Sequence, residues 1–198
     1  INQLVAEMNQ PSPGRSLTSH RKIAVSFRDQ ALFQIFQISL TSLKQLQNDP
    51  SAEEDIMEQV LSLALKCLSF DFVGTSLDES TEDLGTIQIP SSWRPLLEDP
   101  STIQLFFDYY GKTRPSLSST SLECLTRLAS VRRSLFSGEP QRAAFLAQLI
   151  NGTREVLRTQ KGLNEHANYH EYCRLLGRLK TNYQLSELVN VHVSFGMI

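Results

Sequence analysis

Apolar side chains recur every three or four residues over most of this chain, which is the spacing of one face of an α-helix. The first clear stretch runs from Asp29 to Gln47, with Asp29 as the expected N-cap and the cluster 48–50 as the stop. A second helix is expected after Pro50, with Ser51 as its cap and apolar positions at Ile56, Val60, Leu63 and Cys67. We therefore predict two helices near the start of the chain that pack against each other.

Two further helix pairs are predicted in the second half of the chain. Helical spacing resumes after Pro100 and again after Pro115, and these two segments form one pair. The next pair is expected around Leu149 and from His166 onward, with apolar positions at Phe145, Leu146, Leu149, Ile150, Val156 and Leu157, then at Tyr169, Tyr172, Leu176, Leu179 and Tyr183. Helices are thus expected to come in pairs.

The second helix of each pair places a cysteine among leucines. Cys67 lies in LALKCLSF, Cys124 in SLECLTRL and Cys173 in HEYCRLLGRL, so all three are expected in the core. Helix pairs that repeat at about 40–47 residues, stretched here by one insertion, are typical of HEAT-type repeats. A four-helix bundle is the alternative, but the recurring register favours an open stack. We predict an all-α, HEAT-like solenoid over residues 1–198.

The stretch 73–91 interrupts the helical pattern with Gly74, Gly85 and Pro90. It contains no Lys or Arg, and its acidic run includes Asp78, Glu79, Glu82 and Asp83. We expect an exposed acidic loop without a sheet, although residues 86–89 alternate between polar and apolar. The loop is either a solvated insertion or a docking site for a basic partner surface, and in the second case these four carboxylates are the candidate contacts.

Basic residues provide a second candidate contact. Arg21 and Lys22 follow His20 in a cluster that is expected in a loop, whereas the arginines at 132–133 are expected at a helix end. Arginines at helix ends commonly cap carbonyl groups and complement the helix dipole. We therefore include Arg21 and Lys22 among the candidate partner-binding residues.

Charge and composition narrow the class of protein. The 19 Lys and Arg residues against 21 Asp and Glu residues give a net charge of -2, which disfavours a nucleic-acid partner. No apolar run approaches the length that crosses a bilayer, so no membrane partner is expected. Three widely spaced cysteines favour a reducing compartment, and we expect residence in the nucleus or the cytoplasm.

Few residues of the sequence are arranged as a catalytic or metal site would need. His166, His170 and Cys173 have the i, i+4, i+7 spacing of zinc ligands on one helical face, but no fourth ligand is evident, and capping or packing roles are preferred. Cys124 has leucines and Glu123 as neighbours, an apolar and slightly acidic setting that does not activate a thiol. We expect no enzyme, no metal and no cofactor.

Several strings of the sequence resemble exportin-7, a family of Ran-binding nuclear transport receptors in the importin-β superfamily. These strings are HRKIAVSFRD, FDFVGTSLDESTEDLGTIQIPSSWR, STIQLFFDYY, ASVRRSLFSGEPQRAAFL and NYHEYCRLLGRLKTNYQLSELV. They follow one another in order from Asn2 to Val189 and include the acidic loop. The family's proteins are several times longer, and the resemblance corresponds to an internal part of their N-terminal half.

The resemblance implies a HEAT-repeat receptor that binds Ran in its GTP form, carries protein cargo and contacts Phe-Gly nucleoporins while it shuttles through the nuclear pore. Clefts between helices, lined by Phe106, Phe107 and Tyr110, are a candidate nucleoporin site, although core packing is the preferred role for these rings. The pair 165–166 replaces a turn that tends to carry proline in the family, and residues 190–198 form a divergent tail. The alternative function is a HEAT-type scaffold without a transport role.

Overall fold

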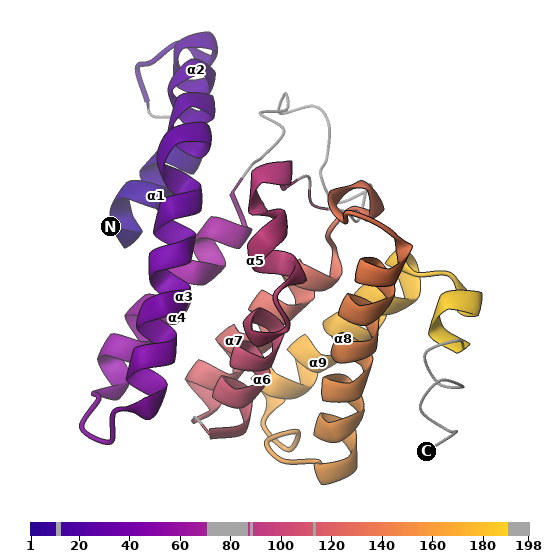
Figure 1. The fold of residues 1–198 in the computed structure, drawn as a ribbon. Coiled ribbons are helices and arrows are strands. Elements are labelled where there is room, and N and C mark those ends of the chain that lie inside the picture. The colour runs from indigo at the N-terminus through magenta and orange to yellow at the C-terminus, as the bar shows by residue number, and fades with distance from the viewer. Residues whose placement is uncertain (11–12, 71–86, 88, 113, 190–198) are drawn as a thin grey trace. The chain divides into compact units, whose positions relative to one another are not determined.

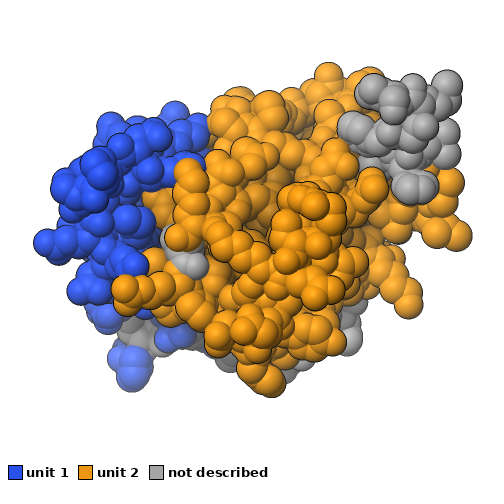
Figure 2. All heavy atoms as spheres, turned by 90° about the horizontal axis from the view of Figure 1, so that it is seen from below, with its two compact units in different colours: residues 1–83 blue, residues 84–198 orange. Residues whose placement is uncertain are grey.

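The computed structural model describes residues 1–10, 13–70, 87, 89–112 and 114–189. The chain divides into two compact units, Ile1–Asp83 and Leu84–Ile198 (Figure 2). Regular structure in the described residues is helical, and the all-α, HEAT-like class predicted from the sequence is confirmed. No helix among these residues combines the length and the apolarity needed to span a bilayer.

The first unit contains α1 (Asn2–Asn9), α2 (Leu17–Phe27), α3 (Phe33–Asn48) and α4 (Glu54–Leu68) (Figure 1). Between α2 and α3 the chain stays helical through a π-helical turn, Arg28–Leu32. The expectation that a helix starts at Asp29 is therefore wrong. The helix starts twelve residues earlier, at Leu17, because the Ser16 hydroxyl caps it by accepting a hydrogen bond from the Ser19 N–H at 3.2 Å.

The α3–α4 pair was predicted correctly, but its turn differs in detail. Glu53, not Ser51, is the N-cap of α4. The Ser51 hydroxyl instead donates a hydrogen bond to the Asp49 carboxylate at 2.6 Å, within the turn. α1 is attached to α4 by Asn2, whose amide donates to the Gln59 carbonyl at 2.9 Å. The core of this unit consists of Val5, Leu32, Phe36, Leu40, Leu43, Leu61, Leu63, Ala64, Cys67, Leu68 and Phe70.

The second unit contains α5 (Arg94–Glu98), α6 (Pro100–Lys112), α7 (Pro115–Ala129), α8 (Glu139–Thr159) and α9 (His166–Asn182), with short 3-10 turns at Ser91–Trp93 and Arg133–Leu135. Both α6 and α7 start at the prolines that the sequence indicated, since proline fits the first helical position. α6 packs against both α7 and α8, and α7 packs against α9 (Figure 1). The unit therefore has one layer of α6 and α8 and a second layer of α7 and α9.

Buried polar side chains join the helices of this second unit. The Ser118 hydroxyl of α7 donates to the Asn168 side-chain oxygen of α9 at 3.0 Å, and the Tyr172 hydroxyl of α9 donates to the Thr153 carbonyl of α8 at 3.0 Å. The Asn168 amide donates to the Gly162 carbonyl at 3.1 Å. The apolar core around these bonds includes Trp93, Leu97, Ile103, Phe106, Leu122, Cys124, Leu125, Leu128, Leu146, Leu149 and Leu175.

The end of the predicted acidic loop is attached to the second unit. Ile87 forms an isolated parallel bridge with Val131: its N–H donates to the Ser130 carbonyl at 2.7 Å, and its carbonyl accepts from the Arg132 N–H at 3.4 Å. Ile87 is thus tied to the chain that follows α7, and Ile89 is buried. Most of the loop 73–91 and all of the tail 190–198 lie outside the described residues. Those boundaries, and a continuous stack over residues 1–198, stay predictions.

Candidate functional site

α9 is the element where sequence and structure differ most. Its buried residues are Asn168, Tyr172, Leu175 and Leu179, at intervals of four, three and four. Cys173 is exposed, so the prediction that all three cysteines lie in the core is wrong for this one, although Cys67 and Cys124 are buried. The inner stripe passes through Tyr172, one residue before the cysteine, because the Tyr172 hydroxyl reaches the Thr153 carbonyl of α8.

The outer side of α9 within the second unit carries a second apolar stripe. Tyr169 is 57% exposed, Leu176 is 43% exposed, and Cys173 lies between them in register. Spacings of four and three residues place these side chains on one face of the helix. On α8, Leu157 is 54% exposed, contrary to the expectation that it belongs to the packed stripe. These residues are a candidate contact surface of the second unit.

The three possible zinc ligands also lie on α9. His166, His170 and Cys173 are all exposed, and α9 begins at His166 as the sequence indicated. The His170 Nδ1 atom lies 3.4 Å from the Glu171 carboxylate. Within the described residues, the structure contains no group of three histidine, cysteine or acidic side chains that is arranged to hold a metal ion.

The buried thiols are poorly suited to nucleophilic chemistry. Burial raises the pKa of Cys67 to about 12, so this thiol stays protonated at neutral pH. Cys124 is completely buried between Leu122 and Leu125 in α7. Both cysteines therefore act as small core residues.

The aromatic residues of α6 are also core residues. Phe106 and Tyr110 are buried, and the Tyr110 hydroxyl donates to the Lys161 carbonyl beyond α8. Phe107 is half-buried against Gly152 of α8, where an added Cβ would lie 2.3 Å from the ring. These contacts assign the rings to helix packing, as preferred from the sequence, and Gly152 permits the close approach of α6 and α8.

Arg21 and Lys22 lie on α2, so the expectation that their cluster is in a loop is wrong. His20 of the same cluster is buried, whereas Lys22 is exposed next to Ile23, which is 38% exposed. α2 thus presents basic and apolar side chains together. A mixed surface of this kind is compatible with binding to a protein.

The four acidic candidates, Asp78, Glu79, Glu82 and Asp83, lie outside the described residues, and their role stays a prediction. Of the arginine pair at 132–133, Arg133 forms an ion pair with Glu139 at 2.7 Å, at the start of α8.

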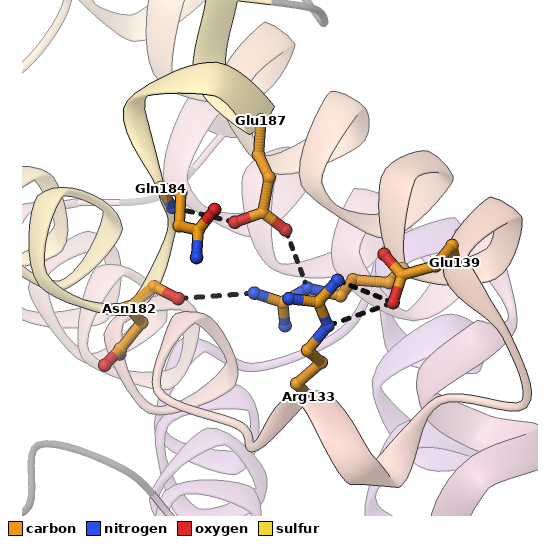
Figure 3. A network of polar contacts seen from close by, with 6 residues as sticks. Arg133, Glu139, Asn182, Gln184 and Glu187 are labelled. Carbon is orange, nitrogen blue, oxygen red and sulfur yellow. Dashed lines mark hydrogen bonds and ion pairs between the residues drawn. The ribbon is translucent and has the colours of Figure 1, made fainter.

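A polar centre that the sequence did not indicate surrounds Arg142 of α8. The Arg142 guanidinium is buried, with Nε 3.1 Å from the Glu187 carboxylate and an Nη donating to the Asn182 carbonyl at 3.2 Å (Figure 3). It also lies over the Tyr183 ring, 4.4 Å from the centroid. We call Arg142, Asn182, Tyr183, Gln184 and Glu187 the Arg142 junction. The only sequence signal was an arginine on the apolar stripe of α8, three residues before Phe145.

Two pKa shifts describe the Arg142 junction. Burial raises the pKa of Tyr183 to about 12, and its hydroxyl has no hydrogen-bond partner among the described residues. Burial acts to raise the pKa of Glu187 as well. Hydrogen bonds from the Gln184 N–H and from Arg142, together with the charge of Arg133, act in the opposite direction, and the pKa is lowered on balance. Glu187 is therefore ionised at neutral pH. The junction is a structural ion pair between segments that lie far apart in the sequence.

Comparison with known proteins assigns these helices to a class. The chain is 50% identical over 196 residues to exportin-7-A of Xenopus laevis and 45% identical over 196 residues to Ran-binding protein 17 of Homo sapiens. It is 39% identical over 195 residues to exportin-7 of Dictyostelium discoideum. Each of these matches covers 96% of this chain, whereas the chain spans only 18–19% of the length of these relatives. No family model matches the chain.

The helix pairs and the relatives together define a helical-repeat protein related to nuclear transport receptors. Over the region compared, the chain is similar to exportin-7 and its relatives, as its sequence strings indicated. Its relatives are named as exportins and Ran-binding proteins, and none of these names refers to an enzymatic activity.

Proposed function

We propose that this chain contributes to a nuclear export receptor that binds Ran in its GTP form together with protein cargo. The observation that carries this proposal is the 50% identity to exportin-7-A over almost the whole chain, within a layered arrangement of helix pairs. In the same proposal the receptor contacts Phe-Gly nucleoporins and shuttles between nucleus and cytoplasm. The net charge of -2 supports a protein partner rather than a nucleic acid.

The mechanism follows from the repeat architecture. Helix pairs that contact mainly their neighbours form long surfaces that flex and wrap a partner. If Ran-GTP and cargo favour the same curvature, the binding of each strengthens the binding of the other by about 1–3 kcal/mol, and this coupling disappears when GTP is hydrolysed. The function is thus reversible binding and needs no catalytic residue.

We further propose two contact regions. The acidic residues Asp78, Glu79, Glu82 and Asp83 attract a basic surface of Ran or cargo and raise the association rate. Arg21 and Lys22 on α2 form the second region, where the neighbouring exposed Ile23 adds apolar contact area.

The test is binding of the chain to Ran loaded with GTP or with GDP, measured by biolayer interferometry at low and at physiological salt. One variant replaces the four acidic residues by serine. A charge-matched control changes Glu53, Glu54 and Glu58 to Gln and Asp55 to Asn, all exposed residues at the start of α4. A third variant changes Arg21 and Lys22 to Gln.

GTP-selective binding by the wild-type chain supports the proposed function. Slower association of the acidic variant, but not of its charge-matched control, supports the acidic contact region, and weaker binding of the variant at Arg21 and Lys22 supports the second region. Selective binding with equal rates in all variants would reject the contact regions and keep the function. No binding in either nucleotide state, by a chain that circular dichroism shows to be folded, would remove Ran binding from these repeats and favour the scaffold alternative.

A further inference from the structure

The chain starts another helix directly after α9. Residues 185–189 are helical, and the N–H groups of Glu187 and Leu188 donate to the Gln184 carbonyl at 3.0 and 3.2 Å. The Glu187 carboxylate in turn accepts from the Gln184 N–H at 2.7 Å. A carboxylate that returns to the backbone N–H three residues before it is the acidic half of a capping box, which stabilises a helix start.

Apolar burial contributes little to holding this helix. Leu185 is 76% exposed and Val189 is 48% exposed, Ser186 is exposed as well, and Leu188 is half-buried. A short helix that buries so little apolar surface is expected to open easily unless other contacts hold it. Polar contacts therefore add to the half-buried Leu188 in holding the helix in place.

Those polar contacts come from Arg142. Its side chain is only 5% exposed, and the guanidinium binds two successive parts of the chain: the carbonyl of Asn182, at the end of α9, and the carboxylate of Glu187, in the new helix. The same group covers the Tyr183 ring between them. The three contacts fix both sides of the turn that leads out of α9, and Figure 3 shows the bonds to Asn182 and Glu187.

The Arg142–Glu187 ion pair differs from the other ion pairs on α8. Its two side chains are 5% and 22% exposed, whereas those of Arg158 and Glu155 are 73% and 59% exposed. Solvent screens an exposed pair strongly and a buried pair weakly, and a buried guanidinium that loses its carboxylate pays a desolvation penalty. The Arg142–Glu187 pair is thus the stronger determinant of local structure.

We propose that the Arg142 junction is a conformational device that sets the direction in which the chain continues after α9. The Arg142–Glu187 pair holds the helix 185–189 to the start of α8, and loss of the pair releases this helix while α8 and α9 stay folded. In a protein built from stacked helices, the placement of one helix start decides where the following residues pack. One ion pair thereby controls where residues 185–189 lie.

Hydrogen exchange of the intact 198-residue chain tests this proposal, measured by mass spectrometry on peptides that cover residues 184–189. Glu187→Gln removes the charge and keeps an oxygen that can accept from the Gln184 N–H. The amides of residues 187 and 188 are expected to exchange about tenfold faster than in the wild type, since a charged hydrogen bond is lost, with no change in α9. Arg142→Lys keeps the positive charge but loses the planar guanidinium, which can donate to two groups at once. It is expected to increase the exchange rate of these amides by a smaller factor.

The matched control is Glu155→Gln, which breaks the exposed pair on the same helix and is expected to leave exchange at 184–189 unchanged. The double variant Arg142→Lys with Glu187→Gln is expected to exchange more slowly than the product of the two single increases predicts, because both changes weaken the same ion pair. Unchanged exchange in Glu187→Gln would overturn the proposal. An equal increase throughout α8 and α9 would overturn it too, because it would show general destabilisation in place of local release.

Discussion

α7 and α9 are both second helices of a pair and both carry a cysteine among leucines, yet they are buried very differently. Nine of the 15 residues of α7 are buried, including Cys124, against four of the 17 residues of α9. α7 packs against α6 on one side and α9 on another, which accounts for its wide buried surface. The comparison shows that a shared sequence register does not fix which side chains are buried. The neighbours of a helix decide this.

The largest expected difference between the two helices is in the cost of removing a leucine. Leu122→Ala in α7 leaves a cavity in the core and is expected to lower the free energy of unfolding by about 3 kcal/mol. Leu176→Ala in α9 removes an exposed side chain and is expected to cost less than about 0.5 kcal/mol. Urea unfolding followed by circular dichroism measures both. Similar losses of unfolding free energy in the two variants would mean that the outer side of α9 is packed against other residues.

A smaller effect is expected where the two helices are joined. Asn168→Ala removes two hydrogen bonds, the one from the Ser118 hydroxyl and the one to the Gly162 carbonyl, and is expected to destabilise the chain by about 2 kcal/mol because each bond contributes about 1 kcal/mol. Asn151→Ala, at an exposed position of α8, is the control and is expected to be nearly neutral. If both variants melt at the same temperature, the Asn168 bonds do not hold α7 to α9.

The smallest expected effect is a gain in stability from a change at the C-terminal end of α9. Tyr183→Phe keeps the ring under Arg142 and removes a buried hydroxyl that has no hydrogen-bond partner among the described residues. We expect the variant to be about 1 kcal/mol more stable, because an unpaired buried hydroxyl carries a desolvation penalty. Thermal unfolding compares it with the wild type. A clear loss of stability would show that this hydroxyl has a partner.

The sequence predicted the helix pairs well because residues that commonly start or stop a helix mark the helix ends. Pro100 and Pro115 mark the starts of α6 and α7 as proline does at a first helical position, and the cluster 48–50 marks the end of α3. The start at Leu17 was missed because the following segment has no clear apolar stripe, although Ser16 is an ordinary cap. α9 was harder because it has two apolar stripes, through Tyr172 and through Tyr169, and periodicity alone does not say which one faces α7 and α8.

Candidate sites were less predictable than helices. The Arg142 junction joins residues 45 positions apart, and nothing in the local pattern around Arg142 names Glu187 as its partner. The resemblance to exportin-7 was found from strings of the sequence, and the comparisons confirm it. Contacts with Ran or cargo stay predictions, since a binding surface built from ordinary surface residues has no motif comparable to a metal or catalytic site.

Thiol reactivity tests the contrast between α7 and α9 most directly. The native chain, treated with a thiol reagent such as DTNB, is expected to react rapidly at one cysteine, Cys173, because Cys67 and Cys124 are buried. All three are expected to react in denaturant, and Cys173→Ser should remove the fast reaction. A native chain without a fast thiol, or one in which Cys124 reacts as fast as Cys173, would contradict the assignment of the inner and outer faces of α9.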